Sequence, residues 1–228
     1  DLVTGVQTCA LPIYFRFHPS QKSSNHLMVV LHGRGDSRLG LEFLRHGLKI
    51  DSMNYLLINA PDPWPIPFGA PGYSWYAMAP NQGPGIVRSS MLLFQLIEEL
   101  ESQGFNRSDI IMCGFSQGCV MSLETALRSS RPFFGVVGMS GFFYKPEELI
   151  KDASPQVRET PILLTHGYGD EILPYETTKG QVDFVGPSLG QLEFHGLTKA
   201  HTIINFEFEL IQEWYYRIAR SKKRIPGD

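Results

Sequence analysis

The sequence predicts an α/β fold in which helices cover both faces of a mostly parallel sheet. Short apolar runs typical of strands alternate along the chain with longer segments of helical period. Several runs are apolar throughout, as expected for strands that are buried on both faces of a sheet. The chain has 228 residues, and α/β chains of this size commonly bury a single core. We therefore expect one domain.

The expected elements follow in chain order, each assigned from its apolar pattern. The strands are the short apolar runs at 27–31, 55–59, 110–113, 136–139, 162–165 and 192–194. The helices are the amphipathic stretches between them, at 39–49, 86–102, 117–129, 175–185 and 202–220. Prolines and glycines forbid regular structure over 61–76, while its aromatic side chains are too many for a solvated loop. We expect that stretch to be a packed surface loop that walls a pocket.

The first residues of the chain resemble a laboratory sequence. Residues 3–13 read like the translation of a widely used short-read sequencing adapter. We therefore expect residues 1–13 to be non-native and assign no element of the fold to them, and we expect residues 14–228 to form the single domain. The alternative is a native N-terminal arm. If the adapter origin holds, a native start with any signal peptide would lie upstream.

Composition excludes several classes of protein. The 20 Lys and Arg residues nearly balance the 23 Asp and Glu residues, so no basic surface for nucleic acid is expected. The apolar runs are far shorter than the ~20 residues that span a bilayer, so no integral membrane association is expected. Cys9, Cys113 and Cys119 are too few for a disulfide framework and lack metal-ligand spacing to histidines. We expect no metal, and we expect the cysteines to be small buried residues rather than a redox switch. The expected location is the cytoplasm.

The sequence Gly-Phe-Ser-Gln-Gly at 114–118 lies between a predicted strand and a predicted helix. A Gly-x-Ser-x-Gly turn in this context is a nucleophile elbow, whose tight backbone leaves no room for side chains at the flanking glycines. The turn holds Ser116 above the sheet as the candidate nucleophile. The helix that follows places the backbone N–H of Gln117 near any negative charge that forms beside Ser116.

A serine nucleophile needs a base to take its proton and a carboxylate to orient that base. In this arrangement the chain order is serine, acid, histidine, so both partners should follow Ser116. His201 lies in the loop before the last helix, where it can reach the serine, and we prefer it to His195, which ends a strand. Asp170 follows the strand at 162–165 among turn-forming glycines and is the candidate acid.

Neighbouring residues offer alternatives to this assignment. Glu171 is adjacent to Asp170 but is expected to point away, and Asp183 belongs to the helix beyond it. Asp170 can also serve as a plain helix N-cap, which would not exclude a catalytic role. His166 comes before any acid of the following loop, which excludes it as the base, and His32 precedes the serine and is expected to be structural.

A second oxyanion donor is expected from the loop after an early strand. The sequence Leu-His-Gly-Arg-Gly-Asp at 31–36 fits this place. Gly33 and Gly35 allow close backbone approach, and the N–H of Arg34 can point at the oxyanion. The expected oxyanion hole therefore consists of backbone N–H groups of Arg34 and Gln117.

Several motifs together resemble those of the phospholipase/carboxylesterase family of α/β hydrolases, which includes the acyl-protein thioesterases. They are Leu-His-Gly-x-Gly-Asp at 31–36, Gly-Phe-Ser-Gln-Gly at 114–118, Met-Ser-Gly at 139–141, His-Gly-x-x-Asp-x-x-x-Pro at 166–174 and Ala-His-x-Ile at 200–203. The resemblance implies an α/β-hydrolase fold and a cofactor-free serine esterase. It implies the triad Ser116, Asp170 and His201 with oxyanion donors at Arg34 and Gln117, the same residues that the motifs and their order selected above.

The resemblance also places the aromatic segment 73–76 near the pocket. The chain departs from the family in two places: Ala200 stands where the family usually has Gly before the catalytic histidine, and the usual Trp-Phe-Asp appears as Trp-Tyr-Ala at 75–77. The second departure leaves the shape of the pocket open. The residues expected to contact substrate are Trp64, Tyr73, Trp75, Phe142 and Leu173.

The expected function is a serine carboxylesterase that hydrolyses short- to medium-chain carboxylic esters through an acyl-enzyme on Ser116. Acyl-protein thioesterase or lysophospholipase activity with the same triad is the alternative within enzymes. A non-catalytic α/β-hydrolase binding module is the alternative outside them. The expected partner is a small-molecule ester or thioester, without nucleic acid or cofactor. A homodimer, the physiological substrate and the preferred acyl length stay open at this point.

Overall fold

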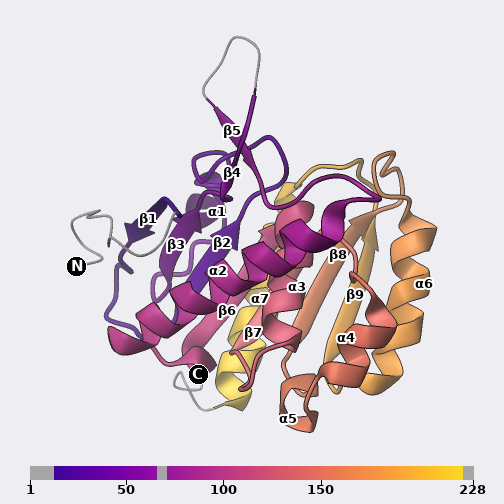
Figure 1. The fold of residues 1–228 in the computed structure, drawn as a ribbon. Coiled ribbons are helices and arrows are strands. Elements are labelled where there is room, and N and C mark those ends of the chain that lie inside the picture. Colours follow the sequence, from indigo (N-terminus) through magenta and orange to yellow (C-terminus); the bar gives the residue numbers. More distant parts are fainter. Residues whose placement is uncertain (1–12, 66–70, 223–228) are drawn as a thin grey trace.

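Within residues 13–65 and 71–222, which the computed structural model describes, seven strands form one sheet (Figure 1). In chain order they are β1 (Phe15–His18), β2 (Leu27–Leu31), β3 (Asn54–Ile58), β6 (Ile110–Phe115), β7 (Gly135–Met139), β8 (Ile162–Gly167) and β9 (Leu192–Leu197). Their order across the sheet is β1-β3-β2-β6-β7-β8-β9, and each neighbouring pair is parallel except β1 with β3. The predicted mostly parallel α/β fold is confirmed.

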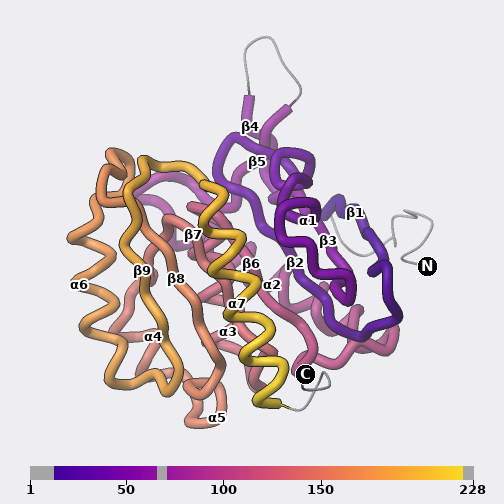
Figure 2. The backbone as a smooth tube through the Cα atoms, turned by 180° about the vertical axis from the view of Figure 1, so that it is seen from behind, coloured from indigo at the N-terminus to yellow at the C-terminus, as the bar shows by residue number. Residues whose placement is uncertain are grey.

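Helices cover both faces of this sheet. One face carries α2 (Gln82–Ser102) and α3 (Gln117–Leu127), with α4 (Pro146–Asp152), α5 (Pro155–Arg158) and α6 (Tyr175–Val185) beside them. The other face carries α1 (Phe43–Gly47) and α7 (Asn205–Ser221), as the reversed view in Figure 2 shows. Two short 3-10 helices, η1 (Arg107–Asp109) and η2 (Gly186–Ser188), lead into β6 and toward β9.

Strand β2 shows why both faces must be covered. All of its residues are buried. Leu27, Val29 and Leu31 belong to the core under α2 and α3, whereas Met28 and Val30 belong to the core under α1 and α7. Because successive side chains of a strand point to opposite faces, a run that is apolar throughout needs a helix layer on each side.

The growth of the sheet changes direction between β2 and β6. Strand β3 lies on one side of β2, and the later strands of this sheet lie on the other side, from β6 outward. Such a switch point opens a crevice at the carboxyl ends of the two central strands. The loop after β2, residues 32–36, and the turn from β6 into α3, residues 114–118, therefore meet at one edge of the sheet.

The prediction that residues 61–76 have no regular structure is wrong. Strands β4 (Asp62–Trp64) and β5 (Gly72–Ser74) pair antiparallel in a separate two-stranded sheet. Pro63 is tolerated within β4 because a ribbon of two strands has outer edges, where a missing N–H removes no ladder hydrogen bond. Residues 66–70 of this stretch lie outside the described residues.

Two helices begin later than predicted. Helix α1 begins at Phe43 rather than at position 39, because residues 37–42 form hydrogen-bonded turns. Helix α7 begins at Asn205 rather than at position 202, because the carboxylate of Glu207 accepts the backbone N–H of Ile204 and caps the helix there. The elements β1, α4 and α5 were not predicted, since each is too short to show a period.

The N-terminal segment is described only at its end. Residues 1–12, which hold Cys9 and most of the segment expected to be non-native, lie outside the described residues. Ile13 is buried in the core under α2 and α3. Among the described residues, no helix has both the length and the apolar character needed to cross a bilayer.

Candidate active site

The turn at 114–118 has the sharp geometry of a nucleophile elbow. Ser116 lies between the end of β6 and the first residue of α3, with φ 54° and ψ −117°, a strained conformation for a residue with a side chain. A Cβ on Gly114 would overlap the carbonyl of Gly118, and a Cβ on Gly118 would overlap the carbonyl oxygen of Leu31. Both positions therefore require glycine, and the turn places Ser116 at the carboxyl edge of the sheet.

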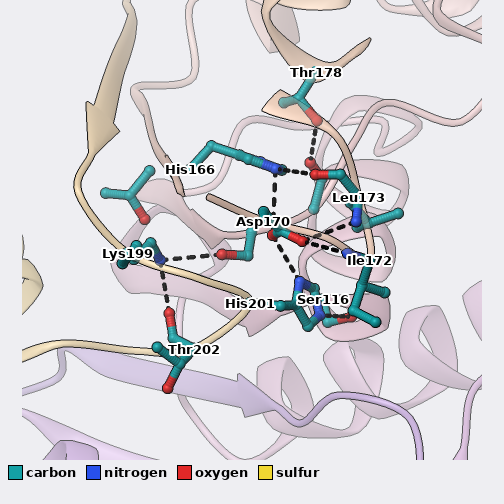
Figure 3. A network of polar contacts seen from close by, with 12 residues as sticks. Ser116, His166, Asp170, Ile172, Leu173, Thr178, Lys199, His201 and Thr202 are labelled. Carbon is teal, nitrogen blue, oxygen red and sulfur yellow. Dashed lines mark hydrogen bonds and ion pairs between the residues drawn. The ribbon is translucent and has the colours of Figure 1, made fainter. Parts of the chain in front are cut away.

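The three candidate catalytic residues lie in one chain of hydrogen bonds (Figure 3). His201 Nε2 is 2.9 Å from Ser116 Oγ, and His201 Nδ1 is 2.7 Å from Asp170 Oδ2. Ser116 follows β6, Asp170 follows β8 and His201 follows β9. The carboxyl ends of parallel strands thus bring together residues that are far apart in the sequence. An imidazole protonated at Nδ1 donates to Asp170 and is free to accept the serine proton at Nε2.

The carboxylate of Asp170 is held by the backbone as well as by His201. Its Oδ1 accepts the N–H groups of Ile172 at 3.0 Å and Leu173 at 2.8 Å, which leaves Oδ2 for the imidazole. Burial acts to raise the pKa of Asp170, but the hydrogen bonds from Leu173, His201 and Ile172 outweigh it, so the pKa lies below its ordinary value. Asp170 is therefore ionised at neutral pH.

A second histidine beside the acid was not assigned a role from the sequence. His166 in β8 is buried, and its Nε2 lies 2.8 Å from the carbonyl oxygen of Leu173 and 3.4 Å from Asp170 Oδ2. Burial lowers the pKa of His166, so the neutral ring donates its Nε2–H to Leu173. His166 therefore stabilises the loop that carries Asp170 through its hydrogen bond to Leu173. Its place in the His-Gly-x-x-Asp motif was the available signal.

The other candidates from the sequence lie apart from this chain of hydrogen bonds. His32 is buried, and both of its ring nitrogens contact backbone groups of the loops after β2 and β3. His195 is half-buried within β9. Glu171 is exposed, and Asp183 forms an ion pair with Lys179 on α6. None of these four residues is part of the chain of hydrogen bonds from Asp170 through His201 to Ser116.

The two residues expected to supply oxyanion donors border the same cavity as Ser116. Gln117 is the first residue of α3, and the N–H groups in the first turn of a helix have no acceptor within the helix. Arg34 lies in the loop at 32–36, which is held against β5 by two backbone hydrogen bonds of 2.8 Å to Tyr73. The loop after β2 and the start of α3 thus border the cavity together with Ser116, the candidate nucleophile.

The side chain of Gln117 fixes the aromatic segment next to the site. Its Oε1 accepts the N–H of Trp75 at 3.0 Å and the hydroxyl of Ser74 at 3.2 Å. Its Nε2 donates to the carbonyl oxygen of Tyr76 at 2.8 Å. All four residues are buried. The residue that follows the candidate nucleophile therefore anchors segment 74–76.

A cavity of about 170 Å³ opens beside Ser116, with a mostly apolar wall. Two of the residues expected to contact substrate, Phe142 and Leu173, are part of this wall. Further apolar surface comes from residues that were not singled out in the sequence: Tyr76, Met78, Ala79 and Ile172. The shape and chemistry of this cavity suit an apolar group attached to a carbonyl.

The other three expected substrate contacts lie outside the described wall of this cavity. Trp75 is fully buried, and its Nε1 donates to the carbonyl oxygen of His32 at 2.9 Å. Tyr73 lies in β5, where its backbone holds the loop at 32–36. Trp64 lies in β4, with the guanidinium of Arg34 over its ring at 5.1 Å from the ring centroid. These aromatic residues support the loops around the cavity.

Clusters of metal ligands and free thiols are the other groups that could carry chemistry. No group of His, Cys, Asp and Glu side chains among the described residues could hold a metal ion. Cys113 and Cys119 are free and buried on either side of the elbow. Burial raises the pKa of Cys119 to about 12, and it raises the pKa of Cys113 as well. Both thiols are therefore protonated at neutral pH.

Comparison with known proteins gives consistent matches over most of the chain. A model of the phospholipase/carboxylesterase family matches residues 14–218. Acyl-protein thioesterase 1 of Yarrowia lipolytica is 29% identical over 188 residues, covering 77% of this chain and 82% of the relative. Carboxylesterase SOBER1 of Arabidopsis thaliana is 26% identical over 210 residues, covering 86% of this chain and 90% of the relative. The crystal structure of the Arabidopsis thaliana protein superposes with a TM-score of 0.76, covering 86% of this chain and 99% of that chain, at 23% identity. That superposition shows a shared fold.

Proposed function

The chain belongs to the phospholipase/carboxylesterase family of α/β hydrolases, and on this premise we propose that it hydrolyses carboxylic esters through an acyl-enzyme on Ser116. His201 acts first as base and then as acid, and Asp170 orients its imidazole. The observation that carries the proposal is the chain of hydrogen bonds from Asp170 through His201 to Ser116, at 2.7 and 2.9 Å. Each group is within reach of the next, as proton transfer during nucleophilic attack requires.

The reaction proceeds in two halves. Ser116 Oγ attacks the carbonyl carbon while its proton passes to His201 Nε2, and His201 then gives this proton to the departing alkoxide, which leaves as the alcohol. In the second half, water gives a proton to His201 and attacks the acyl carbon. The bond to Ser116 then breaks, the serine regains its proton and the carboxylic acid leaves. Asp170, ionised and buried, stabilises the imidazolium that forms in each half.

Backbone N–H groups of Gln117 and Arg34 stabilise the oxyanion in this proposal. Gln117 begins an 11-residue helix, whose N-terminus carries a partial positive charge. Donors that are fixed before the reaction stabilise the charge that develops on the carbonyl oxygen. Both residues border the cavity at Ser116, which supports this assignment.

The size of the cavity favours an acyl group of short to medium length. An apolar cavity of about 150 Å³ holds a benzene molecule, so a cavity of about 170 Å³ has room for an acyl chain of about six carbons. Thioesters are the second candidate substrate, because the same triad attacks a thioester carbonyl and one relative is named an acyl-protein thioesterase. Lysophospholipids stay an alternative whose long acyl chains would extend beyond this cavity.

The setting of the reaction is part of the same proposal. Residues 14–228 form one catalytic domain that acts in the cytoplasm on small-molecule substrates rather than on nucleic acid. A net charge of −3 supports a partner other than a polyanion, and the free, buried thiols of Cys113 and Cys119 support a reducing compartment. A homodimer stays the alternative to a monomer.

A fluorophosphonate probe separates an enzyme from a binding module with the same fold. The probe phosphonylates a serine whose hydroxyl is activated by a neighbouring base. We expect a single adduct, on the peptide that contains Ser116, detected by mass spectrometry after digestion. Heat-unfolded protein is the control and should stay unlabelled. Folded protein that also stays unlabelled would favour the binding module and overturn the proposed function.

A series of p-nitrophenyl esters from acetyl to palmitoyl tests which length of acyl group the cavity accepts. Each methylene that leaves water contributes about 0.8 kcal/mol, or about fourfold in kcat/KM when the gain is realised in the transition state. We therefore expect kcat/KM to rise from acetyl to about hexanoyl and then to level off or fall. A matched butyryl thioester in the same assay compares the two substrate classes.

Two variants tie this series to the cavity wall. Phe142→Ala enlarges the cavity and is expected to move the maximum toward longer acyl groups. Phe184→Ala removes an exposed phenylalanine of α6 and should leave the series unchanged. A rate that climbs steadily to palmitoyl in the wild type would show that the acyl group binds elsewhere.

A further inference from the structure

A buried ion pair joins Lys199 and Glu207 beside the triad. Lys199 Nζ is 2.6 Å from Glu207 Oε1, 3.0 Å from Ser140 Oγ and 2.9 Å from the carbonyl oxygen of Thr202. The side chains of Lys199 and Glu207 are fully buried. An ammonium has three N–H donors, and here each finds an acceptor. Such pairing offsets the cost of removing the lysine charge from water.

Glu207 connects this pair to two elements of the fold. Its Oε1 also accepts the hydroxyl proton of Thr165, at 2.5 Å, and its Oε2 accepts the backbone N–H of Ile204, at 2.8 Å. Thr165 belongs to β8, and Ile204 precedes the first residue of α7. The carboxylate therefore fixes the start of α7 against the strand that leads to Asp170.

The ion pair closes a loop around His201. Lys199 and Glu207 are 8 positions apart, and His201 lies between them. Lys199 Nζ donates to the carbonyl of Thr202, the residue directly after His201 (Figure 3). One buried side chain therefore fixes the backbone that carries the imidazole.

Lys199 also contacts the neighbours of the other two triad residues. Its carbonyl oxygen accepts the N–H of Gly169, the residue before Asp170, at 3.1 Å. Its ammonium donates to Ser140, which directly follows β7, and the last carbonyl of β7 accepts the N–H of Ser116 at 2.9 Å. Lys199 thus links the three segments that carry the serine, the acid and the base.

We propose that Lys199 is a positioning residue that holds His201 in line with Ser116 and Asp170. The proposal rests on the function proposed above. Lys199 transfers no proton, because its buried Nζ is enclosed by three acceptors. It acts through the loop, since a displacement of about 1 Å at a catalytic group can reduce the rate about a hundredfold.

A purely structural role leads to a different expectation. If Lys199 only neutralises the charge of Glu207, its removal destabilises the protein but leaves the folded molecules fully active. Removal of both charges would then restore stability, and the activity per folded molecule would stay at the wild-type level throughout. If Lys199 positions the base, removal of both charges restores stability alone, because the carbonyl of Thr202 still lacks its donor.

The test uses Lys199→Met and the double variant Lys199→Met/Glu207→Gln, whose amide keeps hydrogen-bonding atoms in the place of the carboxylate. Arg107→Met is the matched control: Arg107 forms a largely buried ion pair with Glu101 at 2.8 Å, next to the amino end of β6 and so at the opposite edge of the sheet. We would measure Tm, and kcat and KM for p-nitrophenyl butyrate. Rates are expressed per active site, titrated to completion with the fluorophosphonate, so that unfolded molecules do not count.

Both Lys199 variants are expected to lose about 10- to 100-fold in kcat per active site, with KM within about threefold of the wild type. Lys199→Met should lower Tm by on the order of 10 °C, and the double variant by less. Arg107→Met should also lower Tm, but by less, because Glu101 keeps its ion pair with Arg131, and it should keep the wild-type kcat. Wild-type kcat in the double variant would overturn the proposal.

Two further measurements keep the test independent of a single variant. If neither Lys199 variant folds, Ser140→Gly removes one acceptor of the ammonium at a position with φ 51° that glycine favours. It is expected to lower kcat about two- to tenfold, and an unchanged kcat there would overturn the proposal.

Proton NMR separates this proposal from the proposed function. The N–H shared by His201 and Asp170 gives a far-downfield resonance that requires no substrate. We expect a sharp resonance in the wild type and in Arg107→Met, and a weakened or broadened one in the double variant. An unchanged resonance in the double variant overturns the positioning role. A wild type that shows the resonance but hydrolyses no ester overturns only the proposed function.

Discussion

Ser116→Ala is expected to lower kcat for p-nitrophenyl butyrate by about a millionfold. Alanine removes the Oγ that forms the acyl-enzyme, while the contact between His201 and Asp170 and the cavity wall stay in place. The rate that remains then comes from the oxyanion donors and from substrate binding, which typically leave about 10³- to 10⁴-fold over water. Steady-state kinetics at high enzyme concentration measure the difference.

The control for this variant is Ser130→Ala, which removes an exposed serine after α3. The two variants are purified in parallel, so that a contaminating esterase contributes equally to both. Ser130→Ala should keep the wild-type rate. If Ser116→Ala kept more than about a hundredth of that rate, the nucleophile would have to be another residue.

Asp170→Asn is expected to lower kcat by about 10⁴-fold, because of the way its two oxygens are used. Oδ1 accepts the backbone N–H groups of Ile172 and Leu173, so the single oxygen of an asparagine would be held at that position. Its NH₂ group would then face His201 Nδ1 and force the ring proton onto Nε2. An imidazole protonated at Nε2 cannot accept the proton of Ser116.

The adjacent carboxylate provides the matched control. Glu171→Gln makes the same chemical change one position along the chain, at an exposed side chain, and should keep activity within about twofold of the wild type. Circular dichroism and Tm would show that both variants fold. A loss of activity that was equal in the two variants would indicate a general effect on the loop and would contradict a specific role for Asp170.

The pH dependence of activity reflects the lowered pKa of Asp170. Burial acts to raise the pKa of Asp170, but its hydrogen bonds outweigh this effect and hold the pKa below the ordinary value of about 3.9. The orienting carboxylate and its contribution to stability are therefore lost only when the pH falls through that lowered pKa. A fall of activity that begins above about pH 5 is therefore expected to have a cause other than protonation of Asp170. The pH profile of kcat for p-nitrophenyl butyrate, measured alongside circular dichroism, checks this expectation.

The elbow was predictable from the sequence because its determinants are local. The glycines at both ends of 114–118, the preceding apolar run and the following helix all lie within a short stretch of chain. The fixed chain order then narrowed the search for the acid and the base to a few residues. The structure brings Ser116, Asp170 and His201 together, whereas Glu171 and His195, the alternatives for the acid and the base, lie apart.

The cavity wall was less predictable, because it depends on which side chains of one aromatic segment turn toward the substrate. The sequence favours Trp75, yet this residue is fully buried, and its neighbour Tyr76 lines the cavity. Gln117 determines which of the two side chains faces the cavity, because it forms hydrogen bonds with the backbone of Trp75 and Tyr76, which lie 42 and 41 positions before it in the sequence. No local pattern contains that information.

Buried polar residues were missed for a similar reason. Lys199 has the sequence context of an ordinary loop lysine, and only its contacts with Glu207, Ser140 and Thr202 show that its charge is paired inside the fold. His166 likewise becomes a support for the acid only when the loop after β8 folds back over it. Hydrophobic periodicity predicts the layers of this protein, but it says nothing about charges that the layers enclose.

The hydrogen bonds of Gln117 connect the wall of the substrate pocket to the turn that carries Ser116. Gln117 is the first residue of α3, next to Ser116. Its side-chain amide forms hydrogen bonds with the segment that carries Tyr76 in the pocket wall. In the proposed mechanism, we expect an acyl group that pushes this wall outward to displace the N–H donor of Gln117 as well. We therefore expect a poorly fitting acyl group to lower kcat as well as the affinity for the substrate.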